Sequence, residues 1–134
     1  MRYIWKIRVY NEDRNVKLMK IELKDLFCME WESNKEIILD SDTAYTVTVF
    51  VGPIDSEISN AFYVTICNSD YVRKKEQEDG FFNGLWHLVT ENPEEAKLRE
   101  YFQSQIRLLT GEVWEDYYQK LRLMGKSEFE DYQE

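Results

Sequence analysis

The first half of the chain alternates apolar and polar positions, and this period of two predicts β-strands. In residues 3–9 every second side chain is apolar or aromatic, and a second alternating run covers residues 16–27. The polar segment 11–15 separates the two runs and predicts a turn. A one-residue slip in the alternation near Met19 is typical of a β-bulge or of the start of a new strand.

Residues 45–51 form the clearest strand of the sequence, because Tyr, Thr and Val favour a pleated backbone and the odd-numbered positions share one apolar face. Gly52 ends this run. Residues 61–67 predict a partner strand, so the two runs form an antiparallel hairpin with a long connection. Residues 28–44 are mixed and acidic, which predicts a loop with at most a short strand at 37–39.

A short helix and another strand are predicted next. Asn68 is a favourable N-cap for a helix that runs to about Glu76, and Gly80 restarts the chain. Residues 81–89 then predict a strand, in which Gly84 would mark a bulge.

Two helices are predicted at the end of the chain. Asn92 and Pro93 begin the first, since Asn accepts from free backbone N–H groups and Pro needs no N–H at a helix start. Its stripe at helical spacing consists of Leu98, Tyr101, Phe102, Gln105 and Leu109. The second helix starts near Gly111 and ends at Gly125, which we expect to be left-handed. Its apolar face consists of Trp114, Tyr117, Leu121 and Met124.

Strands followed by helices, without βαβ alternation, predict an α+β fold. We expect one domain over residues 1–134, with a mostly antiparallel sheet from the N-terminal two-thirds packed against two C-terminal helices. Residues 1–18 would contribute an N-terminal extension strand.

The formal net charge of −9, from 26 acidic and 17 basic side chains, restricts the partners. Residues 1–27 hold seven Lys/Arg and four Asp/Glu, so they carry +3 and the remainder carries −12. Such a field repels nucleic acid, whose binding rests on Lys and Arg at the phosphates. A basic protein is the natural complement, and simple solubility is the alternative explanation.

The two cysteines and the N-terminal pattern indicate the compartment. Cys28 and Cys67 lie far apart without metal-ligand spacing, and a secreted chain of this size would usually hold more cysteines. The N-terminus interleaves charged and apolar residues, which fits neither a signal peptide nor a membrane span. The sequence therefore predicts reduced thiols, a cytoplasmic location and no membrane contact.

Catalytic motifs are scarce. His87 is the only histidine and lies in an apolar strand pattern typical of a structural residue, and nothing local supports a nucleophile–base pair with Cys67. The five glycines are scattered, which leaves no phosphate-binding loop, and Asp40 and Asp42 lack the pattern of a calcium site. We therefore expect a protein that is not an enzyme, with no catalytic residue, metal or cofactor.

The end of the chain resembles a known family. It reads Gly111-Glu112-Val113-Trp114, then a helix that ends at Leu123-Met124-Gly125, then Glu128-Phe129-Glu130-Asp131-Tyr132. The strand end at 49–52, the strand at 62–67 and the segment 70–72 agree in order and spacing. From roughly Met19 to Tyr132 the sequence resembles the immunity protein 8 family of bacterial polymorphic toxin systems.

This resemblance implies an α+β immunity protein that binds a cognate toxin domain and blocks it stoichiometrically, without family-wide catalytic residues. Ser127 departs from the family, which often has tryptophan there. Because intoxicating domains are often nucleases with basic clefts, an acidic inhibitor could occlude such an active site. Two alternatives stay open: a small cytosolic enzyme that uses carboxylates, and an adaptor or regulatory module unrelated to toxins. The oligomeric state stays open as well.

We place the toxin-binding surface on acidic residues near the C-terminus, namely Glu112, Glu115, Asp116, Glu128, Glu130 and Asp131. On a helix that starts near Gly111, the first three share one side, largely distinct from the apolar face. Two structural explanations compete with this hypothesis. The first three also favour a helix N-terminus electrostatically, and the last three could belong to a tail anchored by Phe129 and Tyr132. The acidic loop Glu30–Asp42 is the alternative surface.

Overall fold

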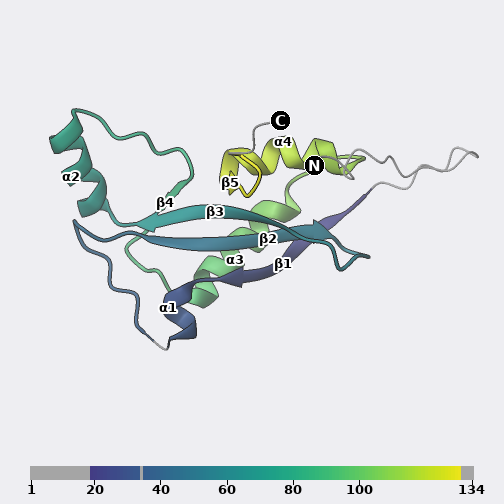
Figure 1. The fold of residues 1–134 in the computed structure, drawn as a ribbon, viewed down its shortest axis with the longest axis horizontal. Helices are drawn as coiled ribbons and strands as arrows, with labels where there is room; N and C mark the ends of the chain where they lie inside the picture. The colour runs from purple at the N-terminus through teal and green to yellow at the C-terminus, as the bar shows by residue number, and fades with distance from the viewer. Residues whose placement is uncertain (1–18, 34, 131–134) are drawn as a thin grey trace, which may run out of the picture.

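One sheet and four helices make up the part of the chain that the computed structural model describes, residues 19–33 and 35–130 (Figure 1). The strands are β1 (Ile21–Phe27), β2 (Tyr45–Pro53), β3 (Asn60–Cys67), β4 (His87–Val89) and β5 (Lys126–Ser127). The helices are α1 (Met29–Glu32), α2 (Ser69–Asp79), α3 (Glu95–Arg107) and α4 (Trp114–Met124). None of these helices is long and apolar enough to cross a bilayer. The strand predicted at residues 3–9 lies outside the described residues.

The sheet has the strand order β1-β2-β3-β4, and β5 pairs with β3 off this path. Its neighbours are antiparallel except β3 and β4, which run parallel. Strands β1 to β4 come from the first two-thirds of the chain, and α3 and α4 follow them. The predicted α+β class, with a mostly antiparallel sheet and two C-terminal helices, is confirmed.

The predicted hairpin forms the centre of the sheet as β2 and β3. One side of the hairpin carries the buried residues Val47, Val49, Val51, Phe62, Val64 and Ile66. The other side carries the exposed or half-buried residues Thr46, Thr48, Phe50, Tyr63 and Thr65. We call the first side the core face and the second the open face. This division follows from the alternation of side chains along a strand.

Helices α3 and α4 contribute the apolar residues that cover the core face. In Figure 1, α3 crosses behind the strands and α4 lies above them. The buried helix residues are Leu98, Phe102 and Ile106 of α3 and Trp114, Tyr117 and Leu121 of α4. They form one hydrophobic cluster with the core face of the hairpin. The Tyr117 hydroxyl also donates to the Met19 carbonyl oxygen (2.6 Å), which ties α4 to the segment before β1.

The start of α3 differs from its prediction. The helix begins at Glu95, and Asn92 does not cap it. Asn92 instead belongs to a turn, in which its backbone amide donates to the Thr90 hydroxyl (2.9 Å). This local hydrogen bond competes with the capping role that the sequence suggested.

The buried stripe of α3 is narrower than predicted. Leu98 and Phe102 are buried as expected, but Tyr101 and Gln105 are exposed, and Ile106 is the third buried residue. A spacing of four residues therefore defines the contact with the sheet. The prediction missed Ile106 because it placed the adjacent residue, Gln105, on the apolar stripe instead.

The second C-terminal helix is shorter than predicted, but its apolar face is confirmed. Helix α4 begins at Trp114, three residues after Gly111, and Gly125 follows it with φ −145°, so the predicted left-handed stop was wrong. A Cβ atom at Gly125 would lie 3.0 Å from Val64 Cγ2 and 3.2 Å from the Tyr63 carbonyl oxygen. The close passage over β3 therefore favours glycine at this position.

Helix α2 confirms its predicted N-cap. The Asn68 side chain accepts a hydrogen bond from the Tyr71 amide (3.0 Å), and the helix runs to Asp79, three residues beyond the prediction. Gly80 follows in the left-handed region with φ +89°, a conformation that glycine adopts without steric cost.

Two strand predictions were partly wrong. Of residues 81–89 only His87–Val89 is a strand, because a turn precedes it, with the His87 amide donating to the Gly84 carbonyl oxygen (3.0 Å). In the segment 28–44, helix α1 replaces part of the expected loop, and residues 37–39 are not a strand. The bulge of β1 lies between Leu23 and Asp25, further along than the slip near Met19 suggested.

We predict that Trp114→Ala lowers the free energy of unfolding by roughly 3–5 kcal/mol, because it would leave a cavity in the core. Only 1% of Trp114 is exposed, whereas Leu123 of the same helix is 72% exposed. Leu123→Ala is therefore the control, with an expected change within about 0.5 kcal/mol. Urea denaturation measures both values. Equal stability of the two variants would contradict the core position of Trp114.

Candidate functional site

The three acidic residues expected at the start of the last helix have different surroundings. Glu112 is exposed and precedes α4. Glu115 is half-buried and accepts a hydrogen bond from Gln119 Nε2 (2.7 Å). Asp116 Oδ2 accepts from the backbone amides of Glu112 (2.9 Å) and Val113 (3.3 Å). Asp116 thus accepts hydrogen bonds from amides at the helix start. Its negative charge also interacts favourably with the positive end of the helix dipole.

The acidic residues of the tail are bonded to the body of the protein. Glu128 makes two hydrogen bonds to Ala61 of β3: its carboxylate accepts from the Ala61 amide (2.8 Å), and its own amide donates to the Ala61 carbonyl oxygen (3.0 Å). Glu130 accepts from an Arg122 guanidinium nitrogen (2.7 Å), and this bond raises the pKa of Arg122. Asp131 lies outside the described residues.

Ser127, the residue where the family often has tryptophan, is buried. Its hydroxyl accepts from the Tyr118 hydroxyl (2.8 Å) and from the Phe129 amide (3.1 Å). It therefore joins α4 to the turn that contains Glu128 and Glu130. A serine here supplies hydrogen bonds that an indole ring could not accept.

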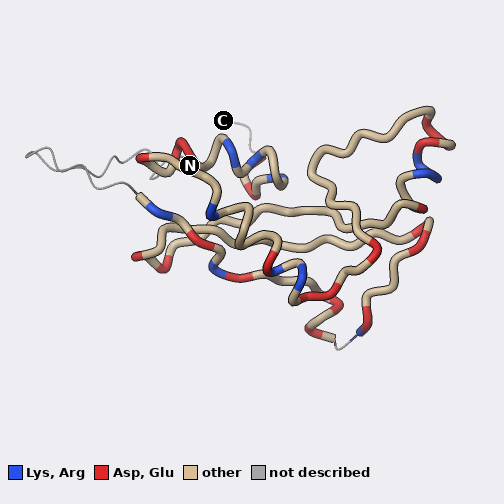
Figure 2. The backbone as a smooth tube through the Cα atoms, turned by 180° about the vertical axis from the view of Figure 1, so that it is seen from behind, with Lys and Arg blue, Asp and Glu red and all other residues tan. Residues whose placement is uncertain are grey.

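The predicted acidic residues do not meet in one cluster. Glu112, Glu115 and Asp116 lie at the start of α4, whereas Glu128 and Glu130 follow its end. Glu130 bonds to Arg122 within α4, and Glu115 also contributes to raising the pKa of this arginine, so these two carboxylates act on one cation while the others are bonded elsewhere. Figure 2 shows acidic positions along the whole backbone, mixed with basic ones.

The alternative acidic segment, Glu30–Asp42, also contains internal bonds. Asp40 accepts from the Asp42 amide (2.8 Å), and a hydrogen bond from Thr43 lowers the pKa of Asp40. Asp42 forms an ion pair with Lys74 of α2. Throughout residues 19–33 and 35–130, no His, Cys, Asp and Glu side chains gather in a group that could hold a metal ion.

The residues considered for catalysis do not form a reactive pair. Burial raises the pKa of the Cys67 thiol, which disfavours the nucleophilic thiolate. His87 Nδ1 lies 2.7 Å from the Leu85 carbonyl oxygen, so this nitrogen is engaged with the backbone. Burial also raises the pKa of Cys28 to about 11. Both cysteines are free and buried, which agrees with the prediction of reduced thiols.

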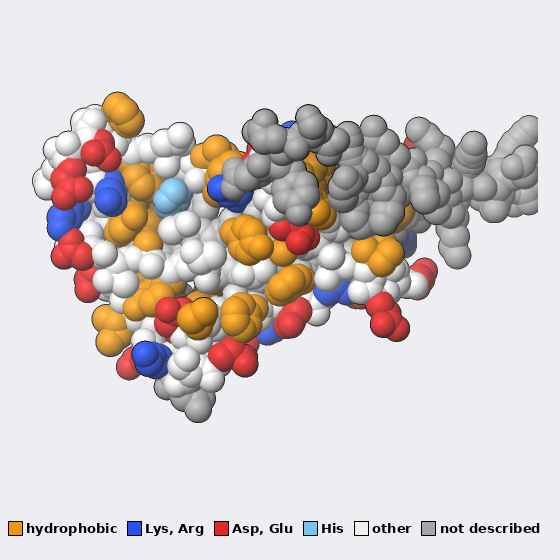
Figure 3. All heavy atoms as spheres, in the orientation of Figure 1, with side chains coloured by type: hydrophobic (Ala, Val, Ile, Leu, Met, Phe, Trp, Pro, Cys, Tyr) orange, Lys and Arg blue, Asp and Glu red, His pale blue; other side chains and the backbone are white. Residues whose placement is uncertain are grey.

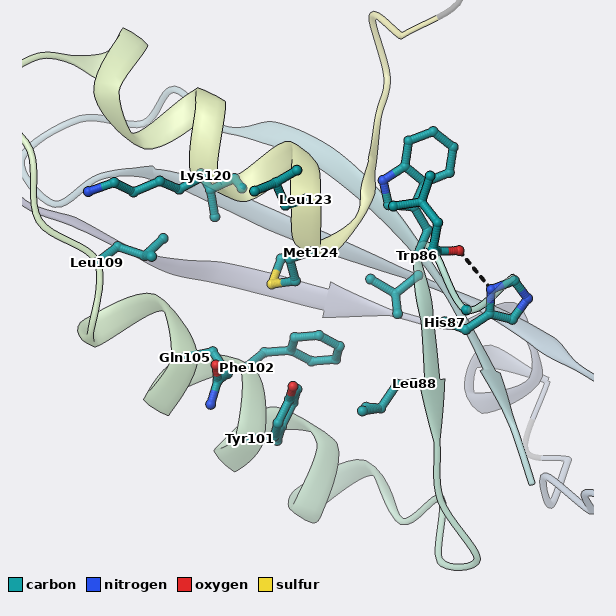
Figure 4. Close-up of a pocket in the computed structure, with 14 residues that line it drawn as sticks. Trp86, His87, Leu88, Tyr101, Phe102, Gln105, Leu109, Lys120, Leu123 and Met124 are labelled. Carbon is teal, nitrogen blue, oxygen red and sulfur yellow. Dashed lines mark hydrogen bonds between the residues drawn. The ribbon is translucent and has the colours of Figure 1, made fainter. Parts of the chain in front are cut away.

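A groove of about 390 Å³ lies between α3, α4 and β4 (Figure 4). Phe102 and Leu121, both fully buried, line its inner part together with Leu88. Figure 4 shows Leu88 pointing towards Phe102 and the imidazole of His87 turned away from the groove. The sequence did not reveal this groove, because its walls come from three elements that are distant along the chain.

The rim of the groove is largely apolar. Leu123, Leu85 and Tyr101 are exposed there. Lys120, also at the groove, donates to the Thr110 carbonyl oxygen (2.6 Å). Such a lining can accept apolar side chains but offers no carboxylate or thiolate for chemistry.

Comparison with known families decides the identity. The model of the family described as immunity protein 8 matches residues 16–132. The chain belongs to the immunity protein 8 family. No curated protein and no solved structure matches it. The matched segment contains every described strand and helix.

We predict that Asp116→Ala lowers the free energy of unfolding by about 1–2 kcal/mol, because two amides at the start of α4 lose their acceptor. Glu115→Ala, one position earlier, should change it by no more than about 0.5 kcal/mol. Thermal and urea denaturation measure the difference. If both variants lose equal stability, the assignment of Asp116 as the capping carboxylate is wrong.

Proposed function

We propose that this immunity protein binds a cognate toxin domain and neutralises it by stoichiometric occlusion. The match to the immunity protein 8 family over residues 16–132 is the observation that supports this proposal. An inhibitor of this kind needs a stable surface and no reactive group. The chain supplies a sheet whose core face belongs to one buried hydrophobic cluster.

The partner that we propose is a basic toxin domain, with a nuclease-type active site as the favoured target. The net charge of −9 supports a cationic partner, because opposite fields accelerate association and raise its specificity. Occlusion of a basic cleft would place carboxylates where the toxin otherwise binds phosphates.

The acidic residues near the C-terminus remain our proposal for part of the contact. Glu112 and Glu115 are the freest to take part, because Asp116 bonds to backbone amides and Glu128 and Glu130 bond to Ala61 and Arg122. The bonded carboxylates can still contribute to the long-range field.

Binding is better supported than an enzyme that uses buried carboxylates. In the described ranges, the buried polar residues are Asn60, Asn68 and Ser127, so no Asp or Glu residue there is buried as a whole. Glu130 has one buried carboxylate oxygen, but its other oxygen is bonded to Arg122, and an ion-paired carboxylate is a poor general acid. A binding mechanism requires none of these features.

Titration of a purified cognate toxin domain with this protein tests occlusion against turnover. We expect toxin activity to fall linearly with added immunity protein and to vanish at a fixed molar ratio. Activity is read after short and long incubation. Complete inactivation of the toxin by a small fraction of an equivalent, growing with time, would reject occlusion and favour an enzyme.

Charge reversal tests the acidic contribution. The double variant Glu112→Lys/Glu115→Lys should associate with the toxin more slowly than the wild type, roughly tenfold at low salt, with a smaller dependence on ionic strength. Stopped-flow mixing at two salt concentrations measures the rates. Lys97→Glu/Lys120→Glu is the control of opposite sign and should not slow association. An unchanged rate in a folded Glu112/Glu115 variant would remove these residues from the contact.

A further inference from the structure

The open face of the sheet carries aligned rows of side chains across β1, β2 and β3. In one row Phe27 pairs with Thr48, which pairs with Tyr63. In the next row Asp25 pairs with Phe50, which pairs with Ala61. A third row, Thr46 with Thr65 and His87, continues onto β4. The strand register therefore fixes where each of these side chains lies.

Aromatic side chains on this face are accessible. Phe27 and Tyr63, in the same row, are each 38% exposed, and Phe50 in the next row is half-buried. Figure 3 shows hydrophobic side chains gathered across the middle of the molecule in this orientation. The solvated face of an antiparallel sheet is usually polar, so exposed aromatics at its centre are a feature to explain.

Carboxylates lie on both sides of these aromatics. On the β1 side, Glu22 and Asp25 are exposed and pair with Gly52 and Phe50. On the β3 side, Glu128 is exposed and bonded to Ala61. Each border also holds a lysine: Lys24 is ion-paired with Glu22, and Lys126 pairs with Tyr63 across β3 and β5. The three carboxylates outnumber the two lysines, which favours a partner with an apolar centre and a net positive edge.

We propose that the open face is the surface on which the basic toxin domain docks, with Phe27, Phe50 and Tyr63 at the centre and Glu22, Asp25 and Glu128 around them. This proposal rests on the proposed function and assigns it a surface. Rigid aromatic side chains on paired strands lose little conformational entropy on binding, and aromatic residues dominate the centres of protein interfaces.

The position of the face also supports this choice. Both C-terminal helices contribute their buried residues to the core face, so docking on the open face requires no rearrangement of the core. Glu128 connects the open face with the C-terminal acidic residues, because its bonds to Ala61 place it at the end of one cross-strand row. The acidic tail and the sheet can therefore contact one partner together.

The test compares toxin affinity between variants of the open face and of the groove. Phe27→Ala/Tyr63→Ala should weaken the equilibrium dissociation constant for the toxin domain about tenfold or more. Leu85→Ala/Leu123→Ala is the matched control, since it removes two exposed apolar side chains at the groove and should leave the constant unchanged. Isothermal titration calorimetry measures affinity, and circular dichroism with urea denaturation verifies that each variant is folded.

A second pair of variants tests the charge of the partner at the same place. Thr48→Arg and Thr48→Glu add long side chains to the middle of the first row. We expect the arginine variant to bind the toxin at least about tenfold more weakly than the glutamate variant at low salt, with the gap narrowing at high salt. Equal, wild-type affinity for both would overturn the proposal even if the double alanine variant failed to fold.

Other outcomes have distinct meanings. If the wild type neither binds nor inhibits the toxin, the proposed function itself fails. If the wild type binds but only the groove variant loses affinity, the open face is the wrong surface. If sedimentation shows a wild-type dimer that Phe27→Ala/Tyr63→Ala dissociates while toxin affinity is unchanged, the face joins two copies of this chain, and the proposal is overturned.

Discussion

The one-sided burial of the β2–β3 hairpin is the constraint on which the rest of the structure depends. Val49 and Phe62 pair across the two strands and are fully buried. Because side chains alternate along each strand, this burial fixes the register and turns Thr48 and Tyr63 to the opposite side. A slip of one residue would exchange the two sets. The core and the exposed aromatic surface therefore have the same physical origin.

Polar bonds attach the C-terminal segment to this framework. Tyr117 bonds to the Met19 carbonyl oxygen, Tyr118 to Ser127, and Glu128 to Ala61 of β3. These contacts join segments that are distant along the chain. The carboxylate of Glu128 is therefore a structural group, and its role cannot be read from the sequence alone. In the binding mode that we propose, Glu128 would serve both stability and recognition at this end of the sheet.

The proposed binding mode combines a long-range and a short-range component. A net charge of −9 acts over distances near the Debye length and attracts a cationic partner without fixing its orientation. Orientation requires shape and apolar contact, which aligned aromatic side chains on a sheet can supply. The groove between α3, α4 and β4 offers a second apolar surface. In the proposed binding mode, substitutions on the open face weaken toxin binding and substitutions at the groove do not.

The sequence by itself determined the hairpin, the cap at Asn68 and the apolar face of Trp114, Tyr117 and Leu121, because local periodicity and capping chemistry specify them. It also carried the family resemblance and the excess of acidic charge. Only the tertiary structure decided which carboxylates are occupied by backbone amides and which aromatics stay exposed. Those properties depend on strand register and on packing between distant elements. Gly125 illustrates the reason. The sequence shows that a glycine ends the helix, but only the structure shows that β3 lies close against it.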